Sequence, residues 1–382
     1  MEYCTRCVMD STDPLMRLDQ EGVCQYCKIH DEMEAKYPLD AIGKIEFDKI
    51  IEQIKKSGKG KKYDCIIGVS GGTDSTYQLH LAKKLGLRVL AVHFDNGWNS
   101  DIAVSNIKKA TDALEYDLMT YVVDWEEFKD LQIAFLKAST PDSEIPTDLA
   151  IQSTLYRIAA EEGIKFIMNG HSFRTEGKVP IMWSYGDGKY LKAVHRIFGN
   201  RKLKTFPNYT IWNLFYYTYV KRIKQVRLLY YVPYNKPEIK KLITEKYGWV
   251  DYGGHHYESV YTRFYQGYIL PRKFGIDKRK REYSALVRSG QMTRDEAFDK
   301  LKNEAPMPPE LAASDKEYVI KKLGLTTEEF EDIMRLPEKT FLDYPNYYSI
   351  IRKFRKPIRW LYRMVSPTTP LLLTEMNVNN ES

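Results

Sequence analysis

The stretch that decides the fold is the apolar run of residues 63–69, which continues directly into Ser70-Gly71-Gly72-Thr73-Asp74-Ser75. The run predicts a strand, and residues 74–85 have the spacing of a helix with one apolar face. Because glycine has no Cβ, the loop between them lets backbone N–H groups approach an anion closely. The helix directs its unpaired N–H groups and its positive dipole end at the same point. The stretch therefore predicts a pyrophosphate-binding loop rather than a plain turn.

The side chains of this loop suit the same ligand. The hydroxyl groups of Ser70, Thr73 and Ser75 can donate hydrogen bonds, and Asp74 is placed to hold Mg²⁺. A Walker loop is excluded because the Gly-Lys-Ser/Thr ending is absent. The string resembles the PP-loop of the ATP pyrophosphatase superfamily, whose members adenylate a substrate oxygen and release pyrophosphate. This resemblance implies ATP and Mg²⁺ as cofactors, with Asp74 catalytic and the phosphates held by Ser70, Gly71, Gly72, Thr73 and Ser75.

Strands and helices alternate after this point. The pattern predicts strands at 63–69, 88–94, 119–123 and 165–169, and helices near 74–85, 100–115, 125–137 and 147–162. Such alternation is typical of an α/β fold with a parallel sheet covered by helices on both faces. The resemblance implies the adenine nucleotide alpha hydrolase type of this fold. A further helix is expected within residues 36–60.

Ligands bind such sheets at the carboxyl ends of the strands. His93 and Asp95 follow the second predicted strand, and Gly170 and His171 follow the last one. By resemblance, Asp95 is expected near the ribose or base, and Gly170 and His171 near the phosphates. His93 fits either the nucleotide site or a buried imidazole that packs at the strand end.

Four of the five cysteines form two pairs, Cys4-x-x-Cys7 and Cys24-x-x-Cys27, with 16 residues between the pairs. This spacing predicts a closed, structural Zn²⁺ site in a ribbon of two short hairpins. Two disulfides are the alternative, which suits a cytosolic chain less well. Cys65 lies inside the first predicted strand and fits a buried apolar position better than a nucleophile.

Length and composition indicate the kind of substrate, the location of the protein and its division into segments. The 382 residues carry a net charge of +7, which suits an anionic substrate. The start lacks a signal-peptide pattern, and no window approaches the roughly 20 apolar residues of a spanning helix, so we expect a cytoplasmic protein. Helices are expected near 209–230, 236–248 and 257–270. We expect four segments: a zinc ribbon (1–35), a PP-loop ATP-binding domain (36–175), a helical, aromatic substrate region (176–310) and a helical extension with a basic tail (311–382).

Several separate stretches carry a closer resemblance. They are residues 3–10, 22–27, 68–75, 169–171, 252–259, 262–268 and 273–279. Over about residues 1–310 the chain resembles the N-acetyl sugar amidotransferase family of bacterial surface-polysaccharide and nonulosonate biosynthesis. The resemblance implies that ATP adenylates the acetamido oxygen of an N-acetyl sugar. Ammonia then adds at the activated carbon and AMP leaves, which gives an acetamidino group.

The source of ammonia is constrained by the cysteines. An N-terminal nucleophile glutaminase needs Cys after Met1, where this chain has Glu2, and only Cys65 follows Cys27. We therefore expect a separate glutaminase partner, by resemblance with a synthase-like companion. The absence of later cysteines argues against a tRNA-modifying PP-loop enzyme that transfers sulfur, and no nucleic acid is expected. A non-catalytic scaffold of a glycan pathway is the other alternative, although a scaffold has no need for an intact loop.

The second half offers three weaker signals. His255, His256, Glu258 and Arg263 form a polar cluster, in which His255 and Glu258 are expected to bind sugar or move protons. A polar cap on a helix is the alternative. Lys273 and Arg279 lie in a cationic stretch expected to meet pyrophosphate or a nucleotide diphosphate, or else to be surface charge. The basic segment 344–364 fits a membrane surface, a partner or a solvated helix face.

Overall fold

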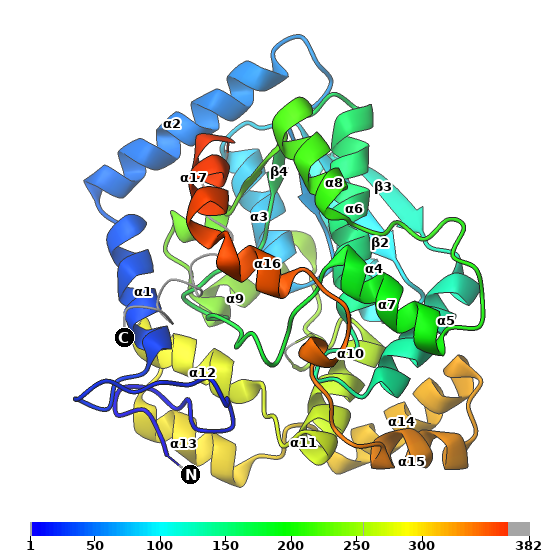
Figure 1. Cartoon of the computed structure of the whole chain (residues 1–382). Coiled ribbons are helices and arrows are strands. Elements are labelled where there is room, and N and C mark those ends of the chain that lie inside the picture. Colours follow the sequence, from blue (N-terminus) through cyan, green and yellow to red (C-terminus); the bar gives the residue numbers. More distant parts are fainter. Residues whose placement is uncertain (1, 255, 366–382) are drawn as a thin grey trace.

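The computed structural model describes residues 2–254 and 256–365 (Figure 1). A five-stranded sheet, parallel throughout, lies at its centre in the order β3-β2-β1-β4-β5. The strands are β1 Cys65–Gly68, β2 Val89–Asp95, β3 Asp117–Val122, β4 Phe166–Met168 and β5 Lys224–Val226. Strands β1 to β3 are added in one direction, and the chain then crosses back to place β4 on the other side of β1. The loops after β1 and β4 therefore meet at the switch point where such sheets bind ligands.

Helices cover both faces of the sheet. They are α2 Ala41–Gly58, α3 Thr73–Lys84, α4 Asp101–Leu114, α5 Trp125–Ala138 and α6 Ile145–Glu161. Cys65 and Ile67 of β1 pack in one cluster with α2, α3 and α4, whereas Ile66 packs against α6 on the opposite face. This alternation follows from the period of two in a strand. Each fully buried isoleucine contributes about 2 kcal/mol to this packing. The predicted parallel α/β fold is confirmed.

One predicted helix is partly wrong. Residues 209–230 do not form a single helix, because α8 (Ile211–Phe215) and a π-helix (Tyr216–Val220) are followed by strand β5 and a short 3-10 turn (Leu228–Tyr230). The helix ends at Arg222, whose φ of 54° is left-handed. The chain then pairs with β4, where the Lys224 N–H donates to the Lys165 carbonyl at 2.8 Å.

The N-terminal segment also differs in detail from two hairpins. Antiparallel bridges join Tyr3 to Asp10 and Leu18 to Cys24, as a ribbon requires. The second cysteine pair, however, opens helix α1 (Gln25–Lys36), so Cys27 lies in the first helical turn. Asp13 accepts a hydrogen bond from the Tyr26 hydroxyl at 2.6 Å and holds this turn against the ribbon.

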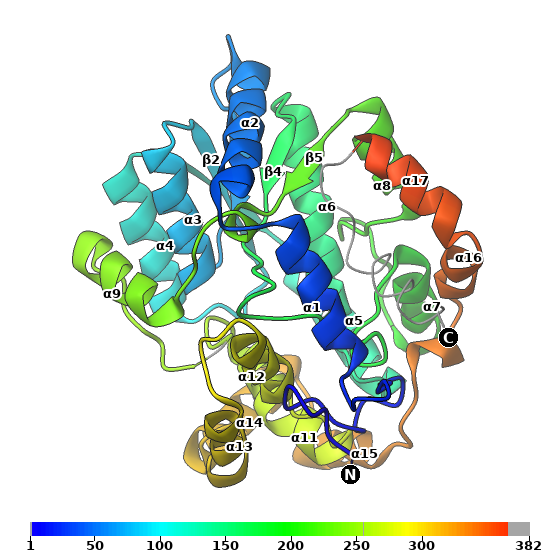
Figure 2. The ribbon, with the colours of Figure 1, turned by 90° about the vertical axis from the view of Figure 1, so that its left-hand side faces the viewer.

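The rest of the chain is mostly helical, as predicted. Its helices are α7 Gly188–Phe198, α9 Lys236–Tyr247, α10 Val260–Phe264, α11 Leu270–Lys273, α12 Arg279–Arg288, α13 Arg294–Asn303, α14 Pro309–Leu323, α15 Thr327–Arg335, α16 Tyr348–Lys353 and α17 Arg355–Val365, with a π-helix at Tyr265–Ile269 and a 3-10 turn at Phe341–Asp343. Figure 2 shows α12 between the N-terminal ribbon and the sheet. The largest apolar cluster joins Cys27, Phe128, Tyr190 and Phe330, so distant segments share one core. No helix within residues 2–254 and 256–365 has the length and apolar character needed to cross a membrane.

Candidate active site

The loop between β1 and α3 is shaped by close backbone packing. Gly71 has a φ of 79°, and a Cβ there would lie 2.2 Å from the Ala103 carbonyl oxygen. The carbonyl oxygen of Gly71 accepts a hydrogen bond from the Trp249 indole N–H at 2.9 Å. Only glycine fits this position, and α4 and Trp249 fix one side of the loop. The loop residues Ser70, Gly72, Thr73, Asp74 and Ser75 line a pocket of about 400 Å³.

Asp74 in the first turn of α3 meets a second carboxylate. Burial raises the pKa of Asp74 to about 8, and the nearby carboxylate of Glu176 adds to this shift. Burial would also raise the pKa of Glu176, but the charges of His171 and Lys236 outweigh it and hold that pKa at about 2. The Tyr234 hydroxyl donates to Asp74, and Lys236 Nζ lies 3.7 Å from its Oδ2. Two facing carboxyl groups offer the oxygen donors that Mg²⁺ prefers, and a bound cation would displace the proton that Asp74 carries near neutral pH.

The cations nearest the loop are not the predicted ones. Lys236 and Lys240 of α9 line the loop pocket. Lys273 instead donates to the carbonyl oxygens of Ile333, Met334 and Leu336 at 2.7 to 3.0 Å, at the end of α15. Arg279 pairs with Asp277, and neither Lys273 nor Arg279 lines the loop pocket or the larger cavity described below. The structure thus places α9, rather than these two residues, at the loop pocket.

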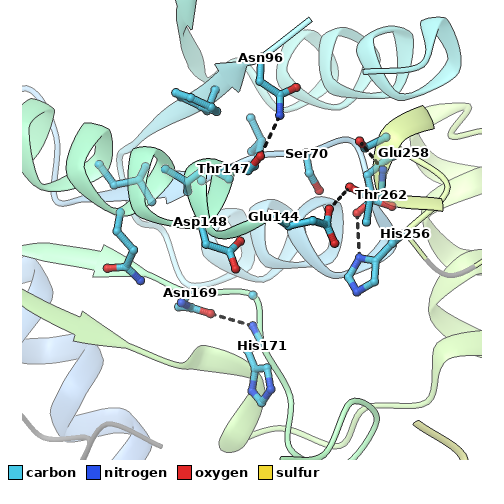
Figure 3. Close-up of a pocket in the computed structure, with 18 of the residues that line it drawn as sticks. Ser70, Asn96, Glu144, Thr147, Asp148, Asn169, His171, His256, Glu258 and Thr262 are labelled. Carbon is cyan, nitrogen blue, oxygen red and sulfur yellow. Dashed lines mark hydrogen bonds and ion pairs between the residues drawn. The ribbon is translucent and has the colours of Figure 1, made fainter. Parts of the chain in front are cut away.

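A larger cavity of about 670 Å³ lies at the carboxyl ends of β1, β2 and β4 (Figure 3). One side, which we call the sheet wall, consists of strand ends. Its residues are Val69, Ser70, Val92, His93, Phe94, Asn96, Asn169, Gly170 and His171. The other side, which we call the outer wall, comes from the start of α6 and from segments after β4. Its residues are Asp142, Glu144, Thr147, Asp148, Glu176, His256, Glu258, Thr262, Gln266, Lys278 and Arg281.

The sheet wall differs from expectation at Asp95. The carboxylate of Asp95 accepts hydrogen bonds from Gly97 N at 2.8 Å and from Asn99 Nδ2 at 3.3 Å, and it does not line the cavity. Its neighbours Phe94 and Asn96 do, so the carboxylate of Asp95 is turned to its own loop by these two hydrogen bonds. His93 lines the cavity, and its Nδ1 lies 3.0 Å from the Val69 carbonyl oxygen.

The turn after β4 lies close to the pyrophosphate loop. A Cβ on Gly170 would lie 3.7 Å from Cβ of Asp74, so the two turns are neighbours. His171 Nδ1 lies 3.2 Å from the Tyr230 hydroxyl, and Nε2 lies 3.4 Å from Glu176. Burial lowers the pKa of His171 to about 4, which leaves it neutral near pH 7. The structure thus brings Gly170 and His171 to the loop, as expected.

Glu258 and His256 form an ion pair on the outer wall. Their Oε1 and Nδ1 atoms lie 3.3 Å apart. Burial lowers the pKa of His256, but Glu258 outweighs this effect and the pKa is raised. Burial likewise raises the pKa of Glu258, and His256 outweighs it, so that pKa is lowered. The backbone holds the pair in place, because Ser100 N donates to the Glu258 carbonyl at 2.8 Å.

Two members of the predicted polar cluster are not on the cavity. Residue His255 lies outside the described residues. Arg263 forms an ion pair of 2.7 Å with Asp315 of α14 and does not line either pocket. Glu258 is therefore the predicted catalytic residue of this segment that the structure places at the cavity, with His256 beside it.

Three carboxylates at the start of α6 complete the outer wall. Glu144 accepts hydrogen bonds from the Thr262 hydroxyl and from Gln266 Nε2 at 3.0 Å. Asp148 is exposed to the cavity, and desolvation by the surrounding walls, with the charges of Asp142 and Glu144, raises its pKa to about 7. Figure 3 shows Glu144, Asp148 and His256 directed into one space. Glu144 and Asp148 can accept hydrogen bonds from hydroxyls, and Asp148 can exchange a proton near neutral pH.

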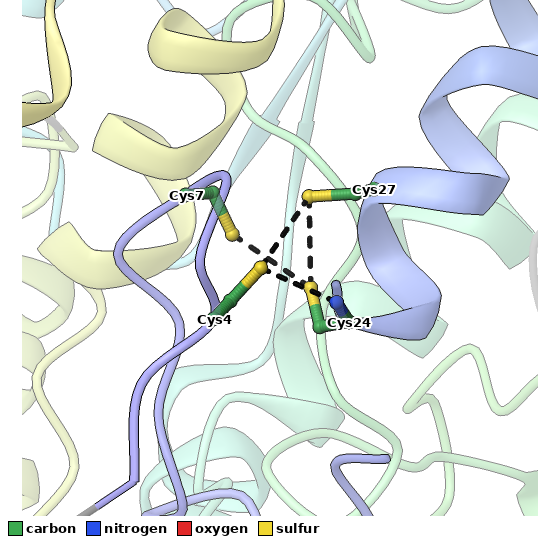
Figure 4. A group of neighbouring side chains, drawn as sticks. All are labelled: Cys4, Cys7, Cys24 and Cys27. Carbon is green, nitrogen blue, oxygen red and sulfur yellow. Dashed lines mark hydrogen bonds between the residues drawn. The ribbon is translucent and has the colours of Figure 1, made fainter. Parts of the chain in front are cut away.

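The four paired cysteines are buried together (Figure 4). The Sγ atoms of Cys4 and Cys27 lie 3.8 Å apart, and those of Cys7 and Cys24 lie 3.7 Å apart. A tetrahedron with bonds of 2.3 Å from the metal to sulfur has edges of about 3.8 Å, so the spacing fits one tetrahedral ion. Arg288 of α12 donates to the sulfurs of Cys7 and Cys27 at 3.3 and 3.4 Å.

Two family models match parts of the chain. The LPS biosynthesis protein WbpG-like, C-terminal domain matches residues 258–357, and the queuosine biosynthesis protein QueC matches residues 64–157. An uncharacterized protein, MJ1599 of Methanocaldococcus jannaschii, is 30% identical over 172 residues. That match covers 44% of this chain and 58% of the archaeal protein, so the chain spans just over half of its length.

Solved structures are similar at low identity. NH3-dependent NAD synthetase from Campylobacter jejuni is 14% identical, with a TM-score of 0.31, over 77% of this chain and 96% of its own. The U34-tRNA thiolase NcsA from Methanococcus maripaludis, with its [4Fe-4S] cluster, is 13% identical, with a TM-score of 0.31, over 81% of this chain and 99% of its own.

Proposed function

We propose that this chain is an ATP-dependent amidotransferase. It combines a QueC-like PP-loop region with a WbpG-like C-terminal domain and so fits the N-acetyl sugar amidotransferase family. It converts the acetamido group of an N-acetyl sugar to an acetamidino group. One observation carries this proposal. The sheet wall lies in or beside the QueC-like region, and Glu258, Thr262, Lys278 and Arg281 of the outer wall lie in the WbpG-like domain. A nucleotide and an acceptor can therefore meet in one cavity.

The loop pocket supplies what ATP needs. Ser70, Gly72 and Ser75 face the phosphates from the loop, and Lys236 and Lys240 balance their charge from α9. The adenosine lies on the sheet wall. Asp74 and Glu176 would hold Mg²⁺, which, when bound, neutralises charge on the phosphates. Positioning and electrostatic stabilisation provide most of the rate in such phosphoryl chemistry.

The reaction then runs in two steps. The acetamido oxygen attacks the α-phosphorus of ATP, the bond to the β-phosphate bridging oxygen breaks, and an imidate adenylate and pyrophosphate form. Ammonia adds at the imidate carbon, a proton is lost, and the carbon–oxygen bond breaks. AMP leaves with the former amide oxygen, and the acetamidino group remains. Asp148 accepts the proton from ammonia, because its raised pKa near 7 suits a general base at neutral pH.

The outer wall holds the acceptor. Glu144 and Gln266 are placed to bind sugar hydroxyl groups, and Lys278 and Arg281 offer positive charge to a nucleotide diphosphate or a carboxylate. Glu258 with His256 lies where the acceptor meets the loop, since a Cβ on Gly72 would lie 4.0 Å from the Glu258 carboxyl carbon. We assign this pair to positioning the acetamido group.

The four-cysteine site is proposed to hold Zn²⁺ in a structural role. Four thiolates leave no open position for a substrate, and each sulfur is buried. Arg288 offsets part of the negative charge that four thiolates place on one ion.

Ammonia is proposed to come from a separate glutaminase, with a synthase-like companion. All five cysteines lie in the described part of the chain, and none of them lines either pocket. A cysteine nucleophile for glutamine hydrolysis is therefore missing from the cavity, and so is one for sulfur transfer to tRNA.

The test is the release of pyrophosphate and AMP from ATP with ammonium chloride and a panel of acetamido sugars, free and nucleotide-linked. We expect AMP only when ammonia and one sugar are both present, and a product 1 Da lighter than that sugar, since NH replaces O. AMP formation that requires tRNA, or no ATP turnover with any sugar, would overturn the proposal. Glu258→Gln separates positioning from proton transfer, because it should raise KM for the sugar more than it lowers kcat.

A further inference from the structure

Large apolar side chains are exposed on two segments that are far apart in the sequence. On α8 and the π-helix that follows it, Trp212 is 76% exposed and Val220 is 59% exposed. On α17, Trp360 is 64% exposed. Ile211, Phe215, Tyr216, Ile350, Phe354 and Leu361 add to this set. Figure 2 shows α17 next to α8, and in Figure 1 the two lie at the same level of the molecule; we call these exposed segments together the basic aromatic surface.

The charge of these segments is one-sided. Residues 188–237 contain eleven lysines and arginines and no aspartate or glutamate. Residues 344–361 contain five basic residues and no acidic one, namely Arg352, Lys353, Arg355, Lys356 and Arg359. Part of this charge lies elsewhere, since Arg201 pairs with Glu126 at 2.9 Å and Arg227 and Lys236 line the two pockets. In the described part of the chain, however, no carboxylate pairs with Arg352, Lys353 or Lys356, and all three are exposed.

Direct contacts fix the turn before α16 to the start of α7. The Tyr347 N–H donates to the Asp187 carboxylate at 2.8 Å, immediately before α7. Lys189 Nζ donates to the Asn346 carbonyl at 3.2 Å and lies 5.0 Å from the centre of the Tyr347 ring. The base of α16 is thereby fixed to the start of α7.

We propose that α8, the π-helix Tyr216–Val220, α16 and α17 form a peripheral binding surface for an anionic lipid bilayer. Tryptophan and tyrosine are favoured at the level of lipid headgroups, and short amphipathic helices lie in that plane with their apolar side chains inserted. Lysine and arginine on the same surface attract anionic headgroups. The aliphatic side chains Val220, Ile350 and Leu361 fit the acyl boundary, whereas single-stranded nucleic acid would be bound by aromatic stacking and phosphate contacts. This surface is separate from the cavity and does not depend on the proposed reaction.

The experiment is flotation of the full chain with two kinds of vesicle, pure phosphatidylcholine and phosphatidylcholine with 30% phosphatidylglycerol, at 50 and 300 mM salt. We expect binding to the anionic vesicles at 50 mM salt and weaker binding at 300 mM salt. The triple variant Arg352→Glu, Lys353→Glu, Lys356→Glu should bind at least about 100-fold less, because each basic residue near an anionic surface contributes roughly fivefold.

Matched variants separate this surface from general charge. Lys55→Glu, Lys56→Glu, Lys59→Glu makes the same change of charge at the end of α2 and should bind like the unchanged protein. Trp212→Ala with Trp360→Ala should lose binding although the charge is kept, and tryptophan fluorescence of the unchanged protein should shift to the blue with anionic vesicles. Circular dichroism and thermal melting confirm that each variant is folded.

Three results would overturn the proposal. They are failure of the unchanged protein to float with anionic vesicles at 50 mM salt, equal loss of binding in the α2 variant, and tighter binding to single-stranded RNA that the same α16–α17 variant abolishes. The last result would assign the surface to nucleic acid instead.

Discussion

The two walls of the cavity are built in different ways. The sheet wall comes from turns that directly follow strands β1, β2 and β4, so each residue is placed by a short stretch of local sequence. The outer wall gathers Glu144, Glu176, Glu258 and Lys278 from four separate segments. A local sequence motif can therefore predict the sheet wall, whereas the residues of the outer wall come together only when the chain has folded. If the sheet wall binds the nucleotide and the outer wall binds the acceptor, substitutions on the two walls should affect activity and stability differently.

The largest effect is expected at Asp74 on the loop. Asp74→Asn removes one of two facing carboxylates and should lower the rate of AMP formation roughly 100- to 1000-fold, the cost of losing one preorganised electrostatic group. The control is Asp95→Asn, which makes the same chemical change at a carboxylate that does not line the cavity. Initial rates over a Mg²⁺ series measure both variants. Equal losses would mean that the strand-end turn matters as a whole and that Asp74 has no special role.

A second effect concerns the backbone of the loop. Gly71→Ala should reduce the free energy of unfolding by about 3 kcal/mol, because the left-handed φ and the contact with Ala103 both oppose a Cβ. Gly60→Ala has a similar φ of 77° with nothing within 4 Å, and it should lose only about 1 kcal/mol. Urea unfolding of both variants distinguishes crowding from backbone strain. Identical losses would contradict the close packing of the loop against α4.

A third prediction tests the helix that adjoins the outer wall. Arg288→Ala removes two donors to the thiolates and should weaken metal binding about 10- to 100-fold, as expected for a side chain that hydrogen-bonds to the metal ligands. Arg294→Ala is the matched change, since Arg294 donates to the carbonyl oxygens of Cys4 and Cys7 and not to sulfur. Competition with a zinc chelator measures both. Similar losses in the two variants would assign the effect to ribbon packing instead.

Asp148 on the outer wall should also make the stability of the protein depend on pH. The raised pKa of Asp148 means that the folded state binds more protons than the unfolded state between about pH 4 and pH 7. Its contribution to stability is thus present at low pH and is lost as the pH rises through 7. Because the cavity admits solvent to this side chain, Asp148→Asn should stabilise the protein by only about 1 kcal/mol at pH 8 and have no effect at pH 4. Melting curves of both proteins from pH 4 to pH 8 measure this difference in stability. An equal effect of the substitution at both pH values would exclude a raised pKa of Asp148.

The smallest effect is expected at Lys273. Lys273→Met should leave the rate of AMP formation within about twofold and reduce the free energy of unfolding by about 1 kcal/mol, since its three acceptors are carbonyl oxygens at the end of α15. Lys236→Met, beside Asp74, should instead lower the rate strongly. A large loss of rate in the first variant would return Lys273 to the pyrophosphate site.

The features predicted from the sequence are those that lie within one short stretch of it, and the features missed are those that distant segments form together. The loop, the four strands from 63 to 169 and the cysteine pairs each carry a pattern that needs no distant partner. Strand β5 was missed because its three residues follow an aromatic run with helical character, and only pairing with β4 makes it a strand. Glu176, Lys236 and Asp148 carry no motif, since each is one ordinary charged residue until folding gathers them.

Two further differences have simple physical reasons. Asp95 follows a strand whose neighbouring residues His93, Phe94 and Asn96 line the cavity, but its carboxylate is engaged by Gly97 N and Asn99 Nδ2 in the turn after the strand. Only some residues of the predicted cationic stretch line the cavity. A helix turns its successive side chains to different neighbours, so Lys278 and Arg281 line the cavity while Arg279 pairs with Asp277.

Helix α12 makes the N-terminal ribbon an inseparable part of this cavity. Its ten residues span about 15 Å, with Arg281 on the cavity near one end and Arg288 on the cysteine sulfurs at the other. The ribbon is therefore not an appendage that can be trimmed, tagged through or exchanged for that of a relative. A redesign of the acceptor specificity of this protein therefore has to keep the four-cysteine site intact.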